Sequence, residues 1–212
     1  MGYSPNTWNQ LTKFFKQADL LNDKFPPGKT IITEEKYYGK EMLELGCQVL
    51  RNAKFSPYNR SACVYFNSIG IRCLSVDIKA CMESISIDLR NPFPEYFYNR
   101  FDIVTNPGTT EHVVSIDGQY EAFKNMHICT KNGGVMIHFV PLYKVYKNGH
   151  SPFYYKKKFF SVLAKLNNYE IINMEVYNNR KNFLISACLR KINQEDFTTD
   201  KNKFFKYIHQ VK

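Results

Sequence analysis

The feature that most constrains the fold of this chain is a short apolar run that ends in an acid, a leucine and a glycine. The run spans Met42–Gln48 and reads MLELGCQ. It is typical of the first strand of an open α/β sheet, followed by a turn over which a ligand lies. Gly46 lets the backbone turn sharply and approach that ligand. Glu44, on the same side of the strand, can accept hydrogen bonds near the turn. Because the same motif occurs in many core strands, its meaning depends on the rest of the chain.

The next two apolar runs both lead to an aspartate. Residues 71–77 predict a strand with Asp77 at its carboxyl end, and residues 84–89 bring Asp88. Residues 101–106 are the clearest buried strand of the chain. Strands that alternate with helices predict a mainly parallel sheet with helices on both faces, in which ligands bind beyond the carboxyl ends of the strands. The residues at or near such ends are Gly46, Asp77, Asp88, Asn106 and His138.

Apolar residues at helical spacing predict the helices. The predicted helices cover residues 1–22, 61–68, 119–129, 159–166 and 204–208. We expect Gly133 and Gly134 to end the third of them, before a strand over residues 135–140. The last two apolar runs, 169–177 and 183–189, predict an antiparallel hairpin. The polar connection 51–59 is longer than usual between a strand and a helix, which is typical of a functional loop.

The bulk composition limits the partners and the compartment. A net charge of +10 favours an acidic partner, such as nucleic acid, a phosphorylated or nucleotide-linked metabolite, or an anionic surface. The six cysteines include no C-x-x-C pair, so they indicate neither a disulfide framework nor a zinc site, and we expect buried thiols in a reducing compartment. No signal peptide follows Met1, and no apolar run approaches the ~20 residues that span a bilayer. We therefore expect a cytoplasmic protein with no membrane partner.

Two adenosine-containing ligands compete for this edge of the sheet. A dinucleotide needs backbone donors for its pyrophosphate, which a G-x-G-x-x-G turn supplies. Here Gly46 is followed by Cys, Gln and Val, and the chain has no P-loop either. S-adenosylmethionine carries no phosphate and is cationic at sulfur, so a glycine-poor turn near an acid suits it. Asp77 can accept hydrogen bonds from both ribose hydroxyls, and Asp88 from the adenine amino group.

On these residues the sequence resembles the class I S-adenosylmethionine-dependent methyltransferases over roughly residues 38–190. The motif of the family's first strand matches Glu44–Gly46, and its ribose acid matches Asp77. The adenine-side acid with its neighbour matches Asp88 and Leu89, and the fourth-strand motif matches residues 101–106. The family's usual second glycine is replaced here by glutamine, and the loop that follows is long.

The resemblance implies an α/β fold built on a Rossmann-like methyltransferase sheet. This sheet is mostly parallel, with an antiparallel C-terminal hairpin and helices on both faces. Three parts are implied: an N-terminal helical extension or lid over 1–36, the methyltransferase domain over 37–190, and a polar C-terminal tail or helix over 191–212. The implied cofactor is S-adenosyl-L-methionine. The residues implied to contact it are Glu44, Gly46, Cys47, Gln48, Asp77, Ile78, Asp88, Leu89 and Asn106.

Methyl transfer requires alignment of the two reactants, and an oxygen acceptor also benefits from a general base. His112, with Glu111 beside it, is the best candidate base, although it can equally cap or orient its loop. His150 lies in a loop after the fifth strand, which in such enzymes often faces the substrate; a plain surface position explains it about as well. His138, inside an apolar strand, is expected to be a core histidine. No set of His, Cys and acid has metal-ligand spacing, so no metal is expected.

The expected function is methylation of a small molecule, at an oxygen of a sugar, a nucleotide-linked sugar or a similar anionic metabolite. Amine and base methylators of this family typically carry Asn/Asp-Pro-Pro-aromatic after the fourth strand, whereas Asn106-Pro107 is followed here by Gly108 and Thr109. One alternative is a nucleic-acid methyltransferase acting on RNA or DNA, since residues 143–160 are rich in lysine and aromatic residues. Another is a non-catalytic binding or scaffold protein. The oligomeric state stays open.

Overall fold

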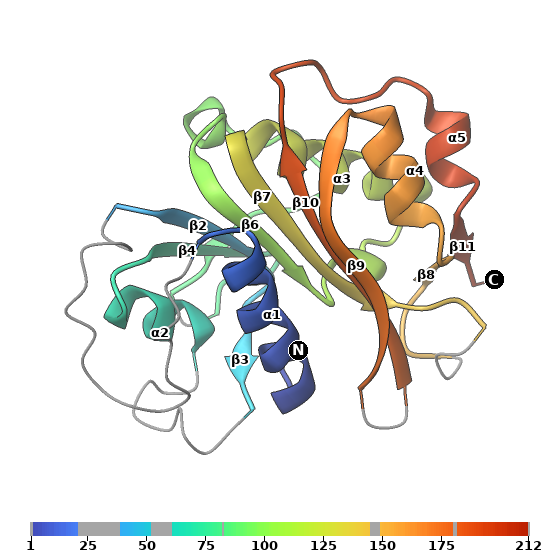
Figure 1. Ribbon diagram of the computed structural model, residues 1–212. Helices are drawn as coiled ribbons and strands as arrows, with labels where there is room; N and C mark the ends of the chain where they lie inside the picture. Colours follow the sequence, from blue (N-terminus) through green and yellow to red (C-terminus); the bar gives the residue numbers. More distant parts are fainter. Residues whose placement is uncertain are drawn as a thin grey trace.

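The computed structural model describes residues 2–20, 39–51, 61–81, 83–144, 149–179 and 182–211. A seven-stranded sheet runs through its centre, with the strand order β5-β4-β2-β6-β7-β10-β9 (Figure 1). Its strands are β2 (Glu41–Leu45), β4 (Arg72–Asp77), β5 (Ile85–Ser86), β6 (Phe101–Pro107), β7 (Thr130–Pro141), β9 (Tyr169–Asn179) and β10 (Asn182–Lys191). All neighbours are parallel except β10, which is antiparallel to both β7 and β9. The predicted mostly parallel sheet with an antiparallel C-terminal hairpin is confirmed.

Helices cover both faces of the sheet (Figure 1). They are α1 (Pro5–Gln17), α2 (Ala62–Ser68), α3 (Ile116–Cys129), α4 (Phe159–Leu166) and α5 (Lys201–Phe205). The apolar residues of α1 and α2 form one core with Val135, Ile137 and Phe139 of β7. Those of α3, α4 and α5 form a second core with Met136 and Val140. Successive side chains of a strand point to opposite faces, which is why β7 contributes to both cores.

Serine side chains define the starts of three helices. Ser4, Ser61 and Ser115 each accept a hydrogen bond from the backbone N–H three residues further on, at the first turns of α1, α2 and α3. Such caps satisfy one of the free N–H groups of a helix start. The helices predicted over residues 61–68 and 159–166 are confirmed to within one residue. The helix predicted over residues 1–22 is confirmed over Pro5–Gln17 only; residues 21 and 22 lie outside the described residues.

The predicted role of the glycine pair after the third helix is wrong. α3 already ends at Cys129, and Gly133 and Gly134 lie inside β7. Gly133 has a φ of +80°, and the register between β6 and β7 is irregular at this point. An irregularity of this kind needs a residue without a Cβ at a left-handed position. The two glycines therefore bend a strand that has begun earlier instead of ending a helix.

The two ends of the described chain form short strands in two small sheets outside the central one. β1 (Gly2–Tyr3) pairs with β3 (Val49–Leu50), and β11 (Ile208–Gln210) pairs antiparallel with β8 (Phe153–Tyr155). The predicted terminal helix is therefore only partly right: α5 ends at Phe205, and Ile208 starts a strand. The division of the chain at residues 36 and 190 stays a prediction, and most of the connection 51–59 lies outside the described residues. Within the described ranges, no helix combines the length and the apolar character needed to cross a membrane.

Candidate active site

A pocket of about 220 Å³ lies beyond the carboxyl ends of β2, β4, β5 and β6. The sheet order reverses here, because β4 and β5 follow β2 on one side while β6 and β7 lie on the other. Open α/β sheets bind their ligands at such a switch point. The pocket is lined by Gly46, Cys47, Gln48, Asp77, Ile78, Asp88, Leu89, Arg90, Thr109, His112, Val113 and Val114. Most of the residues that the sequence associates with a cofactor are thus brought together.

The turn after β2 requires a glycine at its centre. Gly46 has a φ of +78°, and its N–H donates to the carbonyl of Val76 at 2.7 Å. A Cβ built on Gly46 would lie 2.5 Å from Oγ1 of Thr109 and 2.7 Å from Nε2 of Gln48. The backbone therefore turns in the left-handed region and is packed too closely for any side chain.

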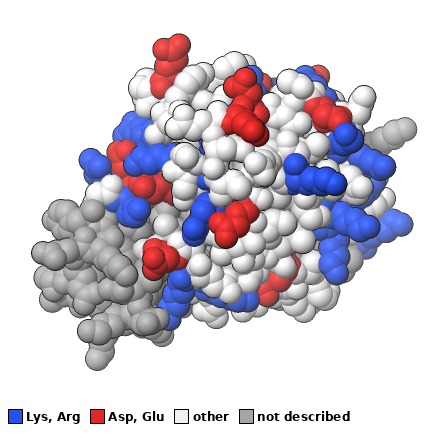
Figure 2. All heavy atoms as spheres, turned by 45° about the horizontal axis from the view of Figure 1, so that its top comes forward, with Lys and Arg blue, Asp and Glu red and all other residues white. Residues whose placement is uncertain are grey.

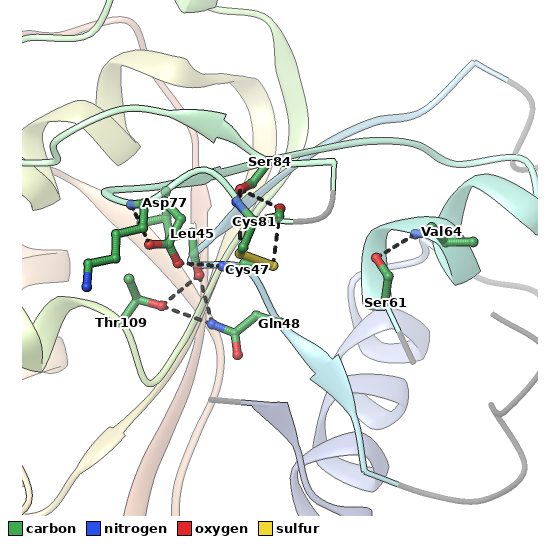
Figure 3. The surroundings of a disulfide bond; sticks show 10 residues. Leu45, Cys47, Gln48, Ser61, Val64, Asp77, Cys81, Ser84 and Thr109 are labelled. Atoms are coloured by element: carbon green, nitrogen blue, oxygen red, sulfur yellow. Dashed lines mark hydrogen bonds between the residues drawn. A yellow bond between two sulfur atoms is a disulfide. The ribbon is translucent and has the colours of Figure 1, made fainter. Parts of the chain in front are cut away.

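Gln48 occupies the position at which the family usually has its second glycine, and its side chain is buried under the turn. Nε2 of Gln48 donates to the carbonyl of Leu45 at 3.0 Å and to Oγ1 of Thr109 at 3.1 Å. The Thr109 hydroxyl also donates to Leu45, at 2.7 Å. Figure 3 shows these three residues converging below the turn. The shape of this loop is therefore fixed by side-chain hydrogen bonds, which a glycine at position 48 could not make.

Asp77, at the end of β4, holds the same turn from the opposite side. Its Oδ2 accepts from the backbone N–H of Cys47 at 2.8 Å, and its Oδ1 accepts from the N–H of Lys79 at 3.1 Å. An ionised carboxylate has about four acceptor positions, so two of them remain for a ligand. The Cys47 N–H is the group that a pyrophosphate would need at this turn, and it is already donated to Asp77 (Figure 3).

Asp88 is bound by an arginine that sequence reasoning did not single out. Nε of Arg90 donates to both Asp88 oxygens, at 3.0 and 2.9 Å, and a terminal guanidinium nitrogen donates to Oδ2 at 2.6 Å. These hydrogen bonds lower the pKa of the Asp88 carboxyl, so it stays ionised. The spacing of two residues, in a turn just past the short strand β5, is the signal that could have identified Arg90.

The expectation of six free thiols is wrong at one place. The sulfur atoms of Cys47 and Cys81 form a disulfide across the rim of the pocket, with their Cα atoms 6.4 Å apart (Figure 3). Because β2 and β4 are parallel neighbours, the loops after both strands meet at one edge although they are far apart in sequence. The remaining cysteines, Cys63, Cys73, Cys129 and Cys188, are free.

All three residues predicted to be catalytic come together beside the pocket. Glu111 and His112 belong to the 3-10 turn Thr110–His112 after β6, and His150 comes from the connection after β7. Oε1 of Glu111 lies 4.0 Å from Nε2 of His112 and 4.0 Å from Nε2 of His150. Burial raises the pKa of Glu111 to about 8 and lowers that of His112 to about 4. At neutral pH both imidazoles and the carboxyl are therefore largely uncharged.

Two of the implied cofactor residues lie outside the lining of this pocket. Asn106 is buried and shapes the loop: its Nδ2 donates to Oγ1 of Thr110, and its Oδ1 accepts from the N–H groups of Thr109 and Thr110. Glu44 is buried in the central strand β2, and burial raises its pKa to about 8. Asn106 therefore holds the loop of Thr109 and Thr110, and the role predicted for Asn106 and Glu44 toward a cofactor stays a prediction.

His138 and the lysine-rich stretch 143–160 also stand out in the sequence, and neither contributes a described residue to the lining of this pocket. His138 is fully buried between the rings of Phe123 and Phe160, which confirms the prediction of a core histidine. In residues 143–160, the rings of Phe153, Tyr154, Tyr155, Phe159 and Phe160 are buried, so they cannot stack on bases. The lysines at 156–158 are exposed. Figure 2 shows basic side chains interspersed with acidic ones over one face, with a basic group along one edge.

Comparison with solved structures identifies the fold. The chain is similar to the 1,6-didemethyltoxoflavin-N1-methyltransferase of Burkholderia thailandensis, which was solved with 1,6-didemethyltoxoflavin and S-adenosylhomocysteine. The two sequences are 12% identical, the match covers 89% of this chain and 82% of that chain, and the TM-score is 0.53. It is similar to the N-methyltransferase NodS of Bradyrhizobium japonicum WM9, solved with S-adenosylhomocysteine (10% identity, 90% and 89% covered, TM-score 0.55). It is also similar to an S-adenosylmethionine-dependent methyltransferase of Clostridium acetobutylicum ATCC 824 (12%, 89% and 92%, TM-score 0.54).

The sequence itself matched no protein-family model and no curated protein. At identities of 10 to 12%, the likeness to solved structures concerns the fold. That fold is the α/β fold of the S-adenosylmethionine-dependent methyltransferases, and the resemblance seen in the sequence is confirmed at this level.

Proposed function

We propose that this protein is an S-adenosylmethionine-dependent methyltransferase whose acceptor is an oxygen of a small, anionic molecule, such as a sugar or a nucleotide-linked sugar. One observation carries the proposal: the pocket at the switch point of the sheet is lined by the Gly46 turn, two aspartates and His112, and His112 is part of an acid–histidine cluster beside it. The first group of residues suits the cofactor, and the cluster suits the acceptor.

The cofactor side fits a nucleoside without phosphate. Asp77 retains acceptor positions for two ribose hydroxyls, and the amide that a phosphate would need is already donated to it. Ile78 and Val114 line the pocket with 61% of their surface exposed, which is unusual for large apolar side chains. Exposed apolar residues at a pocket rim are typical of a ligand site, and an adenine ring would cover them.

The cluster of Glu111, His112 and His150 would act on the acceptor. S-adenosylmethionine, when bound, supplies a methyl group on a sulfonium, which leaves as a neutral thioether. The acceptor hydroxyl must lose its proton as the new bond forms. His112 lines the pocket, and burial lowers its pKa, so its imidazole is neutral and able to accept that proton. The Glu111 carboxyl ionises only above its raised pKa of about 8, and as a carboxylate it would stabilise the resulting imidazolium.

Calorimetric titration with S-adenosylhomocysteine tests the cofactor side. Asp77→Asn removes a charged acceptor, and hydrogen bonds to charged groups are worth about 1.5–3 kcal/mol, so we expect affinity to fall by about 10- to 100-fold. Asp117→Asn, an exposed acid of α3, is the matched control and should bind like the unmodified protein. Absence of S-adenosylhomocysteine binding in the unmodified protein would refute the proposal.

The acceptor class needs a separate measurement. Formation of S-adenosylhomocysteine on a panel of sugars and nucleotide-linked sugars is expected, and binding of cofactor without turnover on any acceptor would instead indicate a non-catalytic protein. A gel shift with RNA and DNA at physiological salt tests the nucleic-acid alternative. Salt-sensitive binding there would favour a nucleic-acid acceptor over a small molecule.

A further inference from the structure

We propose that Glu111, His112 and His150 bind one divalent transition-metal ion of the Zn²⁺ class, and that this ion holds the oxygen of the acceptor at the mouth of the pocket. Metal binding itself stands on the geometry of the three side chains. Its role toward the acceptor rests on the proposed methyl transfer.

The donor atoms of these side chains surround one point. One atom from each residue lies within 4.8 Å of the other two, and Oε1 of Glu111 is 4.0 Å from both Nε2 atoms. Around a zinc ion with bonds of about 2.0–2.1 Å, tetrahedral ligands lie about 3.3 Å apart. Small side-chain rotations therefore close the set around an ion, whereas 4.0 Å is too long for hydrogen bonds among the three.

Two side-chain atoms of this cluster, the second carboxyl oxygen of Glu111 and Nε2 of His112, lack the partners that buried polar groups normally have. The Glu111 side chain is only 2% exposed, and its Oε2 makes no hydrogen bond with any part of the chain that the structure describes. Nε2 of His112 is likewise buried without a hydrogen bond in the described residues. Buried polar atoms left without a partner are costly, and those in native structures call for an explanation such as an ion. A cation bound by the Glu111 carboxyl and the His112 imidazole would give both side chains a partner.

The surrounding structure holds these ligands in place. The hydroxyl of Tyr155 donates to Oε1 of Gln119 at 2.6 Å and accepts from the hydroxyl of Thr110 at 2.8 Å. Nε2 of Gln119 donates to the carbonyl of Thr110 at 2.6 Å. This buried network fixes the turn that carries Glu111 and His112, and outer hydrogen bonds of this kind are what hold metal ligands in position.

The ligand set selects the kind of ion. Mg²⁺ and Ca²⁺ prefer oxygen donors, whereas two imidazoles with one carboxylate suit Zn²⁺ and its first-row neighbours. Three protein ligands leave coordination positions open, as in catalytic metal sites. His112 also lines the pocket, so the ion would lie beside the space where the acceptor would bind.

When the ion is bound, His112 is one of its ligands and no longer the base, so the ion takes over the role proposed above for the His112 imidazole. A hydroxyl bound to it loses its proton to solvent water more easily, because the cation stabilises the oxyanion. That oxygen then forms a bond to the methyl carbon, while the carbon–sulfur bond breaks and its electron pair stays on sulfur. The products are the methyl ether, S-adenosylhomocysteine and one hydronium ion.

The test uses the full chain after dialysis against a chelator, titrated with Zn²⁺ by calorimetry. We expect one ion per chain, and affinity about 100-fold lower in Glu111→Gln and in His150→Ala. His209→Ala removes a histidine outside the cluster and should change nothing. Titration with Co²⁺ should give the visible spectrum of a nitrogen–oxygen site, without the intense charge-transfer band of a thiolate ligand. Far-UV circular dichroism checks that each variant is folded.

The proposal is overturned if the His112→Ala/His150→Ala double variant binds Zn²⁺ as tightly as the unmodified protein, or if the cobalt spectrum shows thiolate ligation. Titration with S-adenosylhomocysteine, run separately on the metal-free protein, distinguishes this failure from that of the proposed function. Zinc binding without S-adenosylhomocysteine binding would leave the metal site standing and remove the methyltransferase. S-adenosylhomocysteine binding without zinc binding would leave the proposed methyltransferase standing and remove the metal site.

Discussion

Replacing Glu44 by glutamine gives a sharp test of the burial of the central strand. Burial raises the pKa of the Glu44 carboxyl from its ordinary value of 4.5 to about 8, and the nearby Tyr3 hydroxyl and Gln48 backbone N–H offset only part of this effect. Between these two pH values the folded protein keeps a proton that the unfolded chain has lost. The stability contributed by the protonated carboxyl is therefore complete below pH 4.5 and is lost as the pH rises to about 8.

The magnitude follows from this pKa shift. Each pH unit within the window changes the free energy of unfolding by about 1.4 kcal/mol, which sums to about 5 kcal/mol. Glutamine is nearly isosteric and does not ionise. The free energy of unfolding of Glu44→Gln, relative to that of the unmodified protein, should therefore rise by this amount per pH unit between about pH 5 and 8 and stay constant above about pH 8. The pKa of Glu111 is raised in the same way, but it is common to both proteins and cancels in the difference.

Urea unfolding at half-unit pH steps measures this difference. Glu95→Gln, which changes an exposed carboxyl in the turn before β6, is the matched control and should show no such slope. A difference between Glu44→Gln and the unmodified protein that does not depend on pH would mean that Glu44 is ionised in the folded state. The argument from burial would then be refuted.

Three further predictions follow from particular contacts. Gly46→Ala places a Cβ at a φ of +78° and 2.5 Å from Oγ1 of Thr109, so we expect a loss of about 2 kcal/mol or more in urea unfolding and weaker S-adenosylhomocysteine binding by calorimetry. Ser115→Ala removes the cap of α3 and should cost about 1 kcal/mol of unfolding free energy, without changing ligand affinity. Asp88→Asn breaks an exposed pair with Arg90, so stability should change by less than about 0.5 kcal/mol while S-adenosylhomocysteine affinity falls.

The sequence was sufficient to predict the sheet and most of the pocket because parallel strands end at the same edge. Gly46, Asp77 and Asp88 each follow an apolar run, so their convergence depends only on strand order. Glu44 shows the limit of this reasoning. The same motif that predicts the turn also places Glu44 inside β2, a central strand with neighbours on both sides and helices over both faces. Its depth of burial depends on packing that no local pattern records.

The sequence named Glu111, His112 and His150 as catalytic candidates, but it did not predict that their donor atoms lie around one point. Each of these residues can be picked out singly in the sequence. They meet because the chain that follows β7 packs against the 3-10 turn Thr110–His112, and Tyr155 makes a contact between the two. Its hydroxyl reaches Thr110, in the same turn as Glu111, from a strand that pairs with β11 near the C-terminus. Such pairing between distant segments leaves no periodic signal, so a metal-ligand spacing could not be recognised.

The same distinction between local and distant causes explains the glycine-poor turn. The absence of further glycines after Gly46 argues against a dinucleotide, but an absence gives no account of what shapes the turn instead. The structure supplies one: the Gln48 amide and the Thr109 hydroxyl hold the Leu45 carbonyl from below, and Asp77 takes the Cys47 N–H from above. With that N–H engaged, a pyrophosphate meets a carboxylate where it needs a donor. The turn is therefore selective against phosphate by the groups it contains, and a ligand that brings hydroxyl donors to Asp77 is the one it favours.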